Sequence, residues 1–359
     1  MKVASFFSGA GGLDRGFENA GFEITYANEY DKAIWDTYRH NFPKTHLDTR
    51  SIVDIEIEEV DDCDGMIGGP PCQSWSEAGA LRGIEDARGQ LFFEYIRILE
   101  GKRPLFFLAE NVSGILFNRH QGAFEEILGH FARLGYNVSY GLLNANHYGV
   151  PQDRERVIIV GYLTQIDRFF EPPAEVSPRP TLEVIRDLAE CASPAGEKNY
   201  SRGELPVSNH EYMTGGFSTI FMSRNRVRPY SKPSFTIQAG GRHAPLHPQA
   251  PEMISVGKDK RVFVEGAEHL YRRLTVRECA RVQTFPDDHL FVYSKVADGY
   301  KMVGNAVPVT FAEHLAQQIK SDLEPHKNID RSKVIEGSIL GPDFGRGSLG
   351  TLLSQRATG

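Results

Sequence analysis

The chain is poor in cysteine and has no closely spaced cysteine pair. Its 359 residues include four cysteines, at positions 63, 72, 191 and 279. This scatter argues against a disulfide framework and against a structural zinc site, because both need grouped ligands. Isolated cysteines are typical of a reducing compartment. We therefore expect a cytoplasmic protein without a metal centre.

Long apolar runs are missing as well. No stretch reaches the roughly 18 apolar residues that a membrane-spanning helix requires. The N-terminal MKVASFFSGAGG turns to glycine after a short apolar segment, so we expect no signal peptide. With 40% hydrophobic and 24% charged residues, the composition indicates a globular protein of one large domain, or of one large and one small.

Charge is distributed unevenly. The net charge is −7, and residues 54–64 contain seven acids and no base. Residues 217–243 contain no acid; their cations are Arg224, Arg226, Arg228, Lys232 and Arg242. A negative net charge disfavours a polyanionic partner, but a local group of cations can still bind one.

The first half of the chain alternates short apolar runs with amphipathic stretches. We expect strands at residues 3–7, 23–27, 65–67, 105–109 and 157–161, and helices at residues 12–20, 31–42, 91–100, 122–134 and 311–323. Alternation at this spacing predicts an α/β fold with a doubly wound, mostly parallel sheet.

A change of composition near residue 171 suggests a second domain. The segment EPPAEVSPRP contains four prolines, and the chain that follows is rich in glycine, proline, arginine and serine. We expect a first domain at 1–170, completed by 294–325, and a smaller loop-rich domain at 171–293. The tail at 326–359 is rich in glycine and serine and is expected to be poorly ordered.

The stretch FFSGAGGLDRGF predicts a strand, a glycine turn and a helix. Gly9, Gly11 and Gly12 allow a tight turn close to a ligand, and Glu29 ends the second strand. This is where a carboxylate accepts hydrogen bonds from a ribose in nucleoside-binding sheets. No Lys-Ser/Thr follows the glycines, so the turn is not an ATP-binding P-loop. A simple packing turn is the alternative.

Cys72 lies in the stretch GGPPCQS after the third expected strand. Prolines fix the backbone there, and the carboxyl ends of parallel strands line the functional crevice. A cysteine thiolate in such a place can act as a nucleophile. The alternative is an inert buried cysteine. A zinc deaminase would need Pro-Cys-x-x-Cys, and Trp75 occupies the second cysteine position.

Two further motifs carry charged groups next to apolar strands. Glu110 follows five apolar residues in LFFLAENVSG, so its carboxylate is either used in chemistry or paired with an arginine. If it is protonated, it can donate a hydrogen bond to a ring nitrogen. Arg154 and Arg156 in QDRER are two apart and should point the same way in an extended segment, suited to anion or carbonyl contacts. A solvated surface pair is the alternative.

The acid-free segment contains alternating arginines in SRNRVRPY, at positions 224, 226 and 228, and Arg242 in AGGRH. Arginine that is bidentate to guanine O6 and N7 is the commonest base-specific contact. A charged face in water is the alternative, but the lack of acids favours nucleic acid.

In chain order, FSGAGG, Glu29, PPCQ, ENV, QDRER, RRLTVREC and GNAVP resemble the DNA (cytosine-5) methyltransferases, and the resemblance covers residues 3–323. Stretches such as SRNRVR and LHPQAP are similar to the HaeIII-type enzymes, which recognise GGCC. The resemblance implies a doubly wound S-adenosylmethionine-binding domain and a smaller target-recognition domain. It also implies double-stranded DNA as substrate and a protective role in a restriction–modification system with a cognate endonuclease. We expect a monomer that does not bind membranes.

The resemblance also assigns roles to residues. Cys72 would attack C6 of a flipped cytosine, Glu110 would bond N3 and the 4-amino group, Arg156 would hold O2, and Arg154 would help to shape the pocket. The expected cofactor-binding residues are Phe7, Gly9, Gly11, Gly12, Leu13, Glu29, Ser51, Ile52, Pro70, Leu91, Asn305 and Ala306. Arg224, Arg226 and Arg242 would read guanines, and Arg228 completes the expected DNA-binding set.

One position departs from the family pattern, and two other functions stay open. Ser51 stands where the family often has an aspartate that meets the adenine amino group, so Ser51, Asp48 or Asp54 would have to make that contact. A nicotinamide-dependent oxidoreductase would explain the glycine turn and Glu29 only. A catalytically inactive DNA-binding module would leave Cys72, Glu110 and Arg156 without a function.

Overall fold

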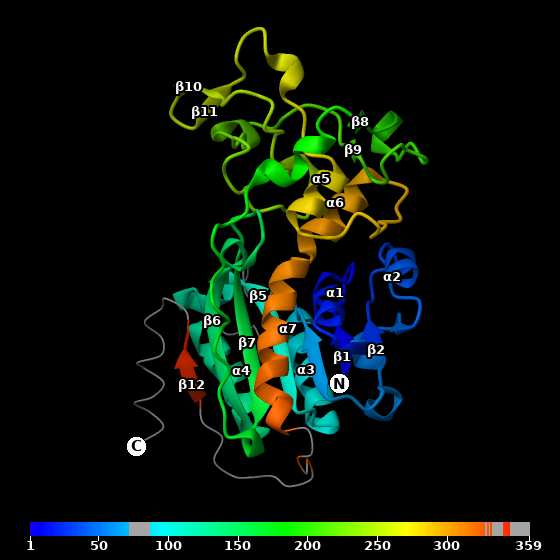
Figure 1. Ribbon diagram of the computed structural model, residues 1–359, viewed down its shortest axis with the longest axis vertical. Coiled ribbons are helices and arrows are strands. Elements are labelled where there is room, and N and C mark those ends of the chain that lie inside the picture. The colour runs from blue at the N-terminus through cyan, green and yellow to red at the C-terminus, as the bar shows by residue number, and fades with distance from the viewer. Residues whose placement is uncertain (72–86, 327–328, 330, 332–339, 345–359) are drawn as a thin grey trace.

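The computed structural model describes residues 1–71, 87–326, 329, 331 and 340–344, and Cys72 lies outside these residues (Figure 1). The strands are β1 (Lys2–Phe6), β2 (Glu23–Asn28), β3 (His46–Asp48), β4 (Gly65–Gly68), β5 (Phe106–Val112), β6 (Tyr136–Asn144), β7 (Glu155–Leu163), β8 (Ser193–Pro194), β9 (Glu211–Tyr212), β10 (Ile254–Gly257), β11 (Lys260–Val262) and β12 (Leu340–Asp343). The α-helices are α1 (Gly12–Asn19), α2 (Trp35–Asn41), α3 (Ala87–Lys102), α4 (Gln121–Arg133), α5 (Val276–Val282), α6 (Val296–Asn305) and α7 (Val309–Leu323).

In this part of the chain, eight strands form one sheet in the order β12-β6-β7-β5-β4-β1-β2-β3. All neighbours are parallel except that β7 runs antiparallel to both β5 and β6. The connection from β6 to β7 is short and returns the chain beside the strand it has just left, which favours an antiparallel pair. The predicted α/β fold with a mostly parallel sheet is confirmed, while β3, β6 and β12 were not predicted.

Helices cover both faces of the sheet, as a doubly wound fold requires. Phe106 of β5 stacks on Phe17 of α1, with ring centroids 6.2 Å apart. Phe107, the next residue, stacks on Phe131 of α4 at 4.2 Å. Successive strand residues point to opposite faces, so α1 and α4 lie on opposite sides. Helix α7 packs closely against α1. A Cβ added at Gly16 of α1 would lie only 2.4 Å from the Cβ of Ala312 in α7, so the contact requires glycine there.

The segment after the sheet has its own buried clusters and forms the upper lobe in Figure 1. Its main cluster contains buried residues of α5 and α6, among them Cys279 and Tyr300. The sequence placed residues 294–325 with the first domain, yet α6 packs in this second cluster. Within the described residues, no helix is both long and apolar enough to cross a membrane.

Of the tail that was expected to be poorly ordered, the structure describes residues 326, 329, 331 and 340–344. Strand β12 pairs in parallel with β6 and adds a strand at that edge of the sheet. Arg331 forms an ion pair with Asp64 and donates a hydrogen bond to the Cys63 carbonyl at 2.8 Å. These contacts join Arg331 and β12 to the sheet, although Gly341 and Pro342 are typical turn residues in the sequence.

Candidate active site

A cavity of about 370 Å³ opens at the carboxyl ends of β1, β2, β4 and β5. It is lined by Ser5, Phe6, Phe7, Ser8, Gly9, Leu13, Glu29, Asp31, Ile34, Gly69, Pro70, Pro71, Glu110, Asn111, Val112, Asn305, Ala306 and Val307. This is the edge where open α/β sheets bind ligands. The volume is within the roughly 300–1,000 Å³ that is usual for small-molecule sites.

The glycine turn and Glu29 meet in this cavity. Gly9 has a φ of +56°, and a Cβ added there would have no atom within 4 Å, so its backbone faces open space. Its N–H donates to Glu29 Oε2 at 2.9 Å, while Glu29 Oε1 accepts from the N–H of Asp31 at 2.7 Å. Burial raises the pKa of Glu29. The cavity thus offers a carboxylate held by two backbone amides, together with apolar side chains, a set that fits a nucleoside-containing group.

Several predicted cofactor residues lie behind the cavity and do not line it. A Cβ at Gly11 would lie 2.1 Å from the Phe42 ring, and one at Gly12 would lie 2.2 Å from the Val307 carbonyl oxygen. These glycines therefore permit the close approach of α1 to its neighbours. Ile52 is buried in the main core, and Leu91 packs against that core.

Ser51, Asp48 and Asp54 are the candidates for the contact that an aspartate makes in the family pattern. Ser51 is half-buried before a short turn of 3₁₀ helix, and neither it nor Asp54 is among the residues that line the cavity. Asp48 is already engaged: it accepts from the Tyr26 hydroxyl at 3.0 Å and from Arg50 Nη2 at 2.7 Å. The arginine and the hydrogen bonds lower the pKa of Asp48 against the effect of its burial.

Glu110 and Arg156 form an ion pair at the wall of the cavity. Arg156 Nε lies 2.8 Å from Glu110 Oε1, and the two side chains are only 13% and 11% exposed. The antiparallel register explains this contact, because Glu110 lies opposite Ile158 and Arg156 is its diagonal neighbour. The salt bridge considered as the alternative for Glu110 is therefore present, and its partner is another predicted site residue.

Asn111 holds the turn that leads to Cys72, a function that the sequence analysis missed. Its Nδ2 donates to the Pro70 carbonyl at 3.0 Å, and its Oδ1 accepts from the Val112 N–H at 2.9 Å. Gly69 lies beside Glu110, since a Cβ there would be 3.3 Å from Glu110 Oε2. The end of β5 and the Pro70 turn are thereby fixed to each other. Cys72 itself is outside the described residues.

Arg154 makes contacts different from those of Arg156. It is 1% exposed and donates to three carbonyls: Ile237 at 3.1 Å, Gly304 at 3.0 Å and Ala306 at 2.9 Å. Gly304 and Ala306 are at the C-terminal end of α6, where the helix dipole favours a cation. Burial and the nearby Arg156 lower the pKa of Arg154. Arg154 thus joins QDRER to the turn that carries Asn305.

The four predicted DNA-binding arginines have different surroundings. Arg224 and Arg242 are exposed. Arg226 is half-buried: its Nε donates to the Phe221 carbonyl at 2.9 Å, and its guanidinium lies 4.8 Å from the Phe221 ring centroid. Arg228 forms an ion pair with Asp153 and lies over the Phe235 ring. Arg224 and Arg242 are therefore the most accessible of the four.

A buried aspartate lies beneath the glycine turn. Asp14 is fully buried and accepts from the Ser5 hydroxyl at 2.6 Å and the Tyr38 hydroxyl at 2.5 Å. Desolvation raises its pKa from 3.8 to about 7, against the effect of these two hydrogen bonds. The folded protein therefore binds a proton at Asp14 over a pH range in which the unfolded chain has lost it.

We expect Asp14 to weaken the protein as pH rises. Its stabilising effect is present below about pH 4 and is lost as pH rises through about 7, a change of up to about 4 kcal/mol on the order-of-magnitude scale of 1.36 kcal/mol per pKa unit. Urea unfolding of the protein and of Asp14→Asn at pH 5 and pH 8 measures this. The variant should lose less stability between the two pH values; an equal loss would contradict the assignment.

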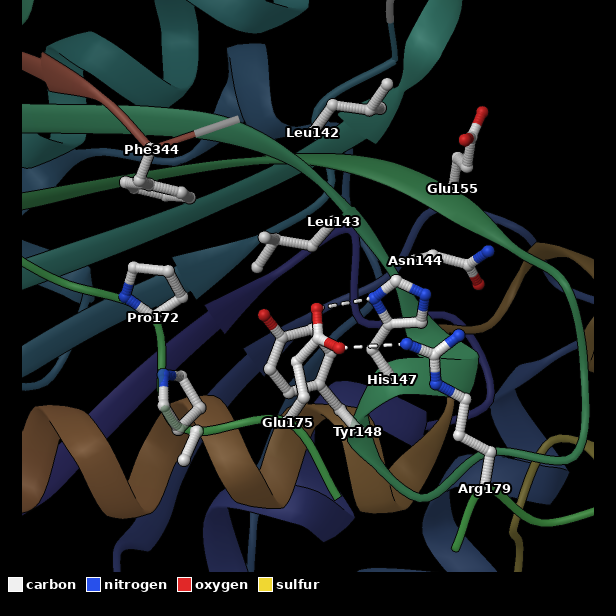
Figure 2. A pocket seen from close by; sticks show the side chains of 12 residues that line it. Leu142, Leu143, Asn144, His147, Tyr148, Glu155, Pro172, Glu175, Arg179 and Phe344 are labelled. Carbon is white, nitrogen blue, oxygen red and sulfur yellow. Dashed lines mark hydrogen bonds and ion pairs between the residues drawn. The ribbon is translucent and has the colours of Figure 1, made fainter. Parts of the chain in front are cut away.

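A second and larger cavity, of about 770 Å³, lies where β6 ends and β7 begins, and residues 172–179 contribute to its lining (Figure 2). Glu175 accepts from Arg179 Nη2 at 2.9 Å, and its Oε1 is 2.7 Å from His147 Nδ1. None of the described residues that line it belongs to the set predicted from the sequence. Its charged groups are largely paired with one another, and the first cavity remains the better candidate.

Comparison with known proteins identifies the family of this chain. A family model described as C-5 cytosine-specific DNA methylase matches residues 1–321. The type II methyltransferase M.FnuDI of Fusobacterium nucleatum is 54% identical over 336 residues, which cover 92% of this chain and 97% of that protein. The type II methyltransferase M.MthTI of Methanothermobacter thermautotrophicus is 55% identical over 326 residues, covering 90% and 98%.

Solved structures share the fold at much lower sequence identity. The crystal structure of a Spodoptera frugiperda DNMT2 mutant superposes with a TM-score of 0.65 at 19% identity, covering 89% of this chain and 99% of that one. At that identity the likeness supports the arrangement of strands and helices alone.

Proposed function

Because the chain belongs to the family of C-5 cytosine-specific DNA methylases, we propose that it methylates a cytosine within GGCC and protects DNA from a cognate endonuclease. The family establishes the reaction class: the protein is a DNA (cytosine-5-)-methyltransferase of the type II restriction–modification kind that uses S-adenosylmethionine. The observation that carries the residue assignments is the Glu110–Arg156 pair at the wall of the cavity. The target GGCC rests on the likeness of stretches such as SRNRVR and LHPQAP to HaeIII-type enzymes.

We assign cofactor binding to the residues that line this cavity. S-adenosylmethionine, when bound, supplies an electrophilic methyl group. Glu29 would accept hydrogen bonds from the ribose, and Phe7 would stack on the adenine. Gly9, Leu13, Pro70, Asn305 and Ala306 complete the lining. Gly11, Gly12, Ile52 and Leu91 would support the site through packing, and Ser51 stays a candidate for the adenine amino group.

The catalytic proposal assigns a bond-making or charge-stabilising task to each group. The Cys72 thiolate adds to C6 of a flipped cytosine, which breaks the C5–C6 double bond and makes C5 nucleophilic. Glu110, in its protonated form, donates to N3 and accepts from the 4-amino group, which favours addition at C6. Arg156 holds O2. Transfer of the methyl group to C5 would release S-adenosylhomocysteine, and loss of the C5 proton to water with departure of the Cys72 thiolate would restore the aromatic ring.

Target reading is assigned to the arginines of the second lobe. Arg224, Arg226 and Arg242 would contact guanines in the major groove. Arg228 is also a DNA-binding candidate, although its ion pair with Asp153 would compete with that contact. A monomer in a cytoplasmic compartment, acting beside an endonuclease, is the proposed biological setting.

The test is methylation of plasmid DNA by the purified protein with S-adenosylmethionine, followed by bisulfite sequencing. We expect 5-methylcytosine at GGCC only, together with protection from an endonuclease that cuts unmethylated GGCC. The Cys72→Ser variant should bind the cofactor and yield no methylation. Methylation elsewhere would refute the target, and an active Cys72→Ser variant would refute the nucleophile. No methylation with bound cofactor would favour the inactive DNA-binding module.

A further inference from the structure

A two-stranded ribbon projects from the second lobe at its far end (Figure 1). Strands β10 and β11 are antiparallel, with Ile254 opposite Val262 and Ser255 opposite Arg261. Every residue of β10 is exposed. Ile254 and Val256 are 46% and 51% exposed, a high fraction for large apolar side chains, and within the described residues β10 and β11 pair only with each other. The ribbon therefore exposes surface, part of it apolar, that is accessible to a binding partner.

The tip of the ribbon, which comprises the turn and the first two residues of β11, is basic in a chain whose net charge is negative. Residues 258–261 are Lys-Asp-Lys-Arg, three cations and one acid, whereas the net charge of the chain is −7. Both lysines are exposed, and among the described residues neither takes part in an ion pair. Glu252 and Glu265 flank the strands and lie outside the turn. The positive charge is thus concentrated at the tip.

The ribbon is fixed to the loop that carries the DNA-reading candidates. The N–H of Met253, just before β10, donates to Asn225 Oδ1 at 3.1 Å, and Asn225 lies between Arg224 and Arg226. Phe263, just after β11, stacks on Tyr271 at 4.1 Å and contacts Phe217 at 5.4 Å. The ribbon and the arginine loop therefore share one small core and keep a fixed spacing.

We propose that the β10–β11 ribbon is a second DNA-binding element, which holds the phosphate backbone outside the recognition sequence through Lys258 and Lys260. A two-stranded ribbon has dimensions that fit the major groove, and lysine is a point charge suited to phosphate. Phosphate contacts hold the duplex in register without reading its sequence. The position of the ribbon relative to DNA rests on the proposed role of Arg224 and Arg226.

The test compares Lys258→Gln/Lys260→Gln with a control, Lys2→Gln/Lys44→Gln. The control lysines are also exposed, but they lie at the start of β1 and before β3, at the sheet edge opposite the cavity. Anisotropy titrations with GGCC and non-GGCC duplexes over a range of salt give the slope of log K against log salt. Each lost phosphate contact lowers that slope by about 0.9, so the ribbon variant should lose about 1.8.

Further readouts separate this proposal from the target assignment. The ribbon variant should weaken binding to both duplexes by the same factor, and kcat at saturating DNA should not change. On a duplex that ends close to the target, the difference from the parent protein should disappear. The bisulfite pattern should also be unchanged, whatever the target proves to be. An unaltered salt slope, or a loss limited to one sequence, would overturn the proposal.

Discussion

Replacing Glu110 with glutamine is expected to lower kcat for methyl transfer by roughly 10²- to 10⁴-fold, the range for a lost acid–base group. Glutamine has nearly the same shape and can still form hydrogen bonds, but unlike a carboxylic acid it cannot transfer a proton to N3 as C6 is attacked. It also leaves Arg156, whose Nε lies 2.8 Å from Glu110 Oε1, without its counter-ion. Single-turnover transfer to a GGCC duplex measures the effect, and cofactor affinity should change only a few-fold.

A matched control exists on helix α3. Glu94 pairs with Arg97 Nε at 2.6 Å, and its side chain is 24% exposed. Glu94 is not among the residues that line the cavity. Glu94→Gln therefore removes a similar ion pair that costs at most about 1 kcal/mol of stability, and kcat should stay within about twofold because Glu94 does not line the cavity. A loss of kcat as large as that of Glu110→Gln would mean that the Glu110 effect reports stability and not chemistry.

The double variant tests whether Glu110 and Arg156 act as one unit. If both hold the same cytosine, Glu110→Gln combined with Arg156→Ala should lose little more than the more damaging single change. If their losses simply multiply, the two side chains act independently and the shared site is refuted. The direct ion pair between them makes coupling the expected result.

The sequence predicted the inner strands well and the outer ones poorly, for physical reasons. The strand expected at 65–67 is present at Gly65–Gly68. It could be predicted because a central parallel strand that is buried on both faces is a continuous apolar run. Strand β6, YNVSYGLLN, mixes polar and apolar residues, and β12 contains glycine and proline. Their burial and pairing depend on neighbours that are distant in sequence, and local pattern carries little of that information.

The orientation of β7 was also invisible in the sequence, and it decides the site. QDRER leads into the start of this strand, so in a parallel strand it would lie at the edge of the sheet opposite Glu110. Because β7 runs antiparallel to β5, its start reaches the carboxyl end of β5 and brings Arg156 to Glu110. The likeness to a family supplied the pairing of these motifs. Spacing alone could not, and for the same reason it could not identify Asn111 as the residue that holds the Pro70 turn.

Arg154→Met is expected to destabilise the protein by roughly 3–5 kcal/mol, because removing a group from a buried network leaves its partners unsatisfied. The carbonyls of Ile237 and Gly304 would lose the arginine donor, and Ala306 would keep only Gln283 Nε2 at 3.2 Å. The stability of Arg154→Lys should lie between those of the parent protein and Arg154→Met. An ammonium group keeps the charge but cannot reproduce the planar fork of the guanidinium. Denaturant unfolding of the three proteins measures the order.

Arg154→Lys should also weaken cofactor binding, which a purely global loss of stability would not do. Gly304 and Ala306 flank Asn305 in the turn that lines the cavity, so Arg154→Lys should raise the dissociation constant for S-adenosylmethionine under conditions where the variant is fully folded. Arg179→Met is the control: it removes an exposed arginine paired with Glu175, and it should cost at most about 1 kcal/mol. If Arg154→Lys were destabilised but bound the cofactor normally, the arginine would hold the lobes together without shaping the turn.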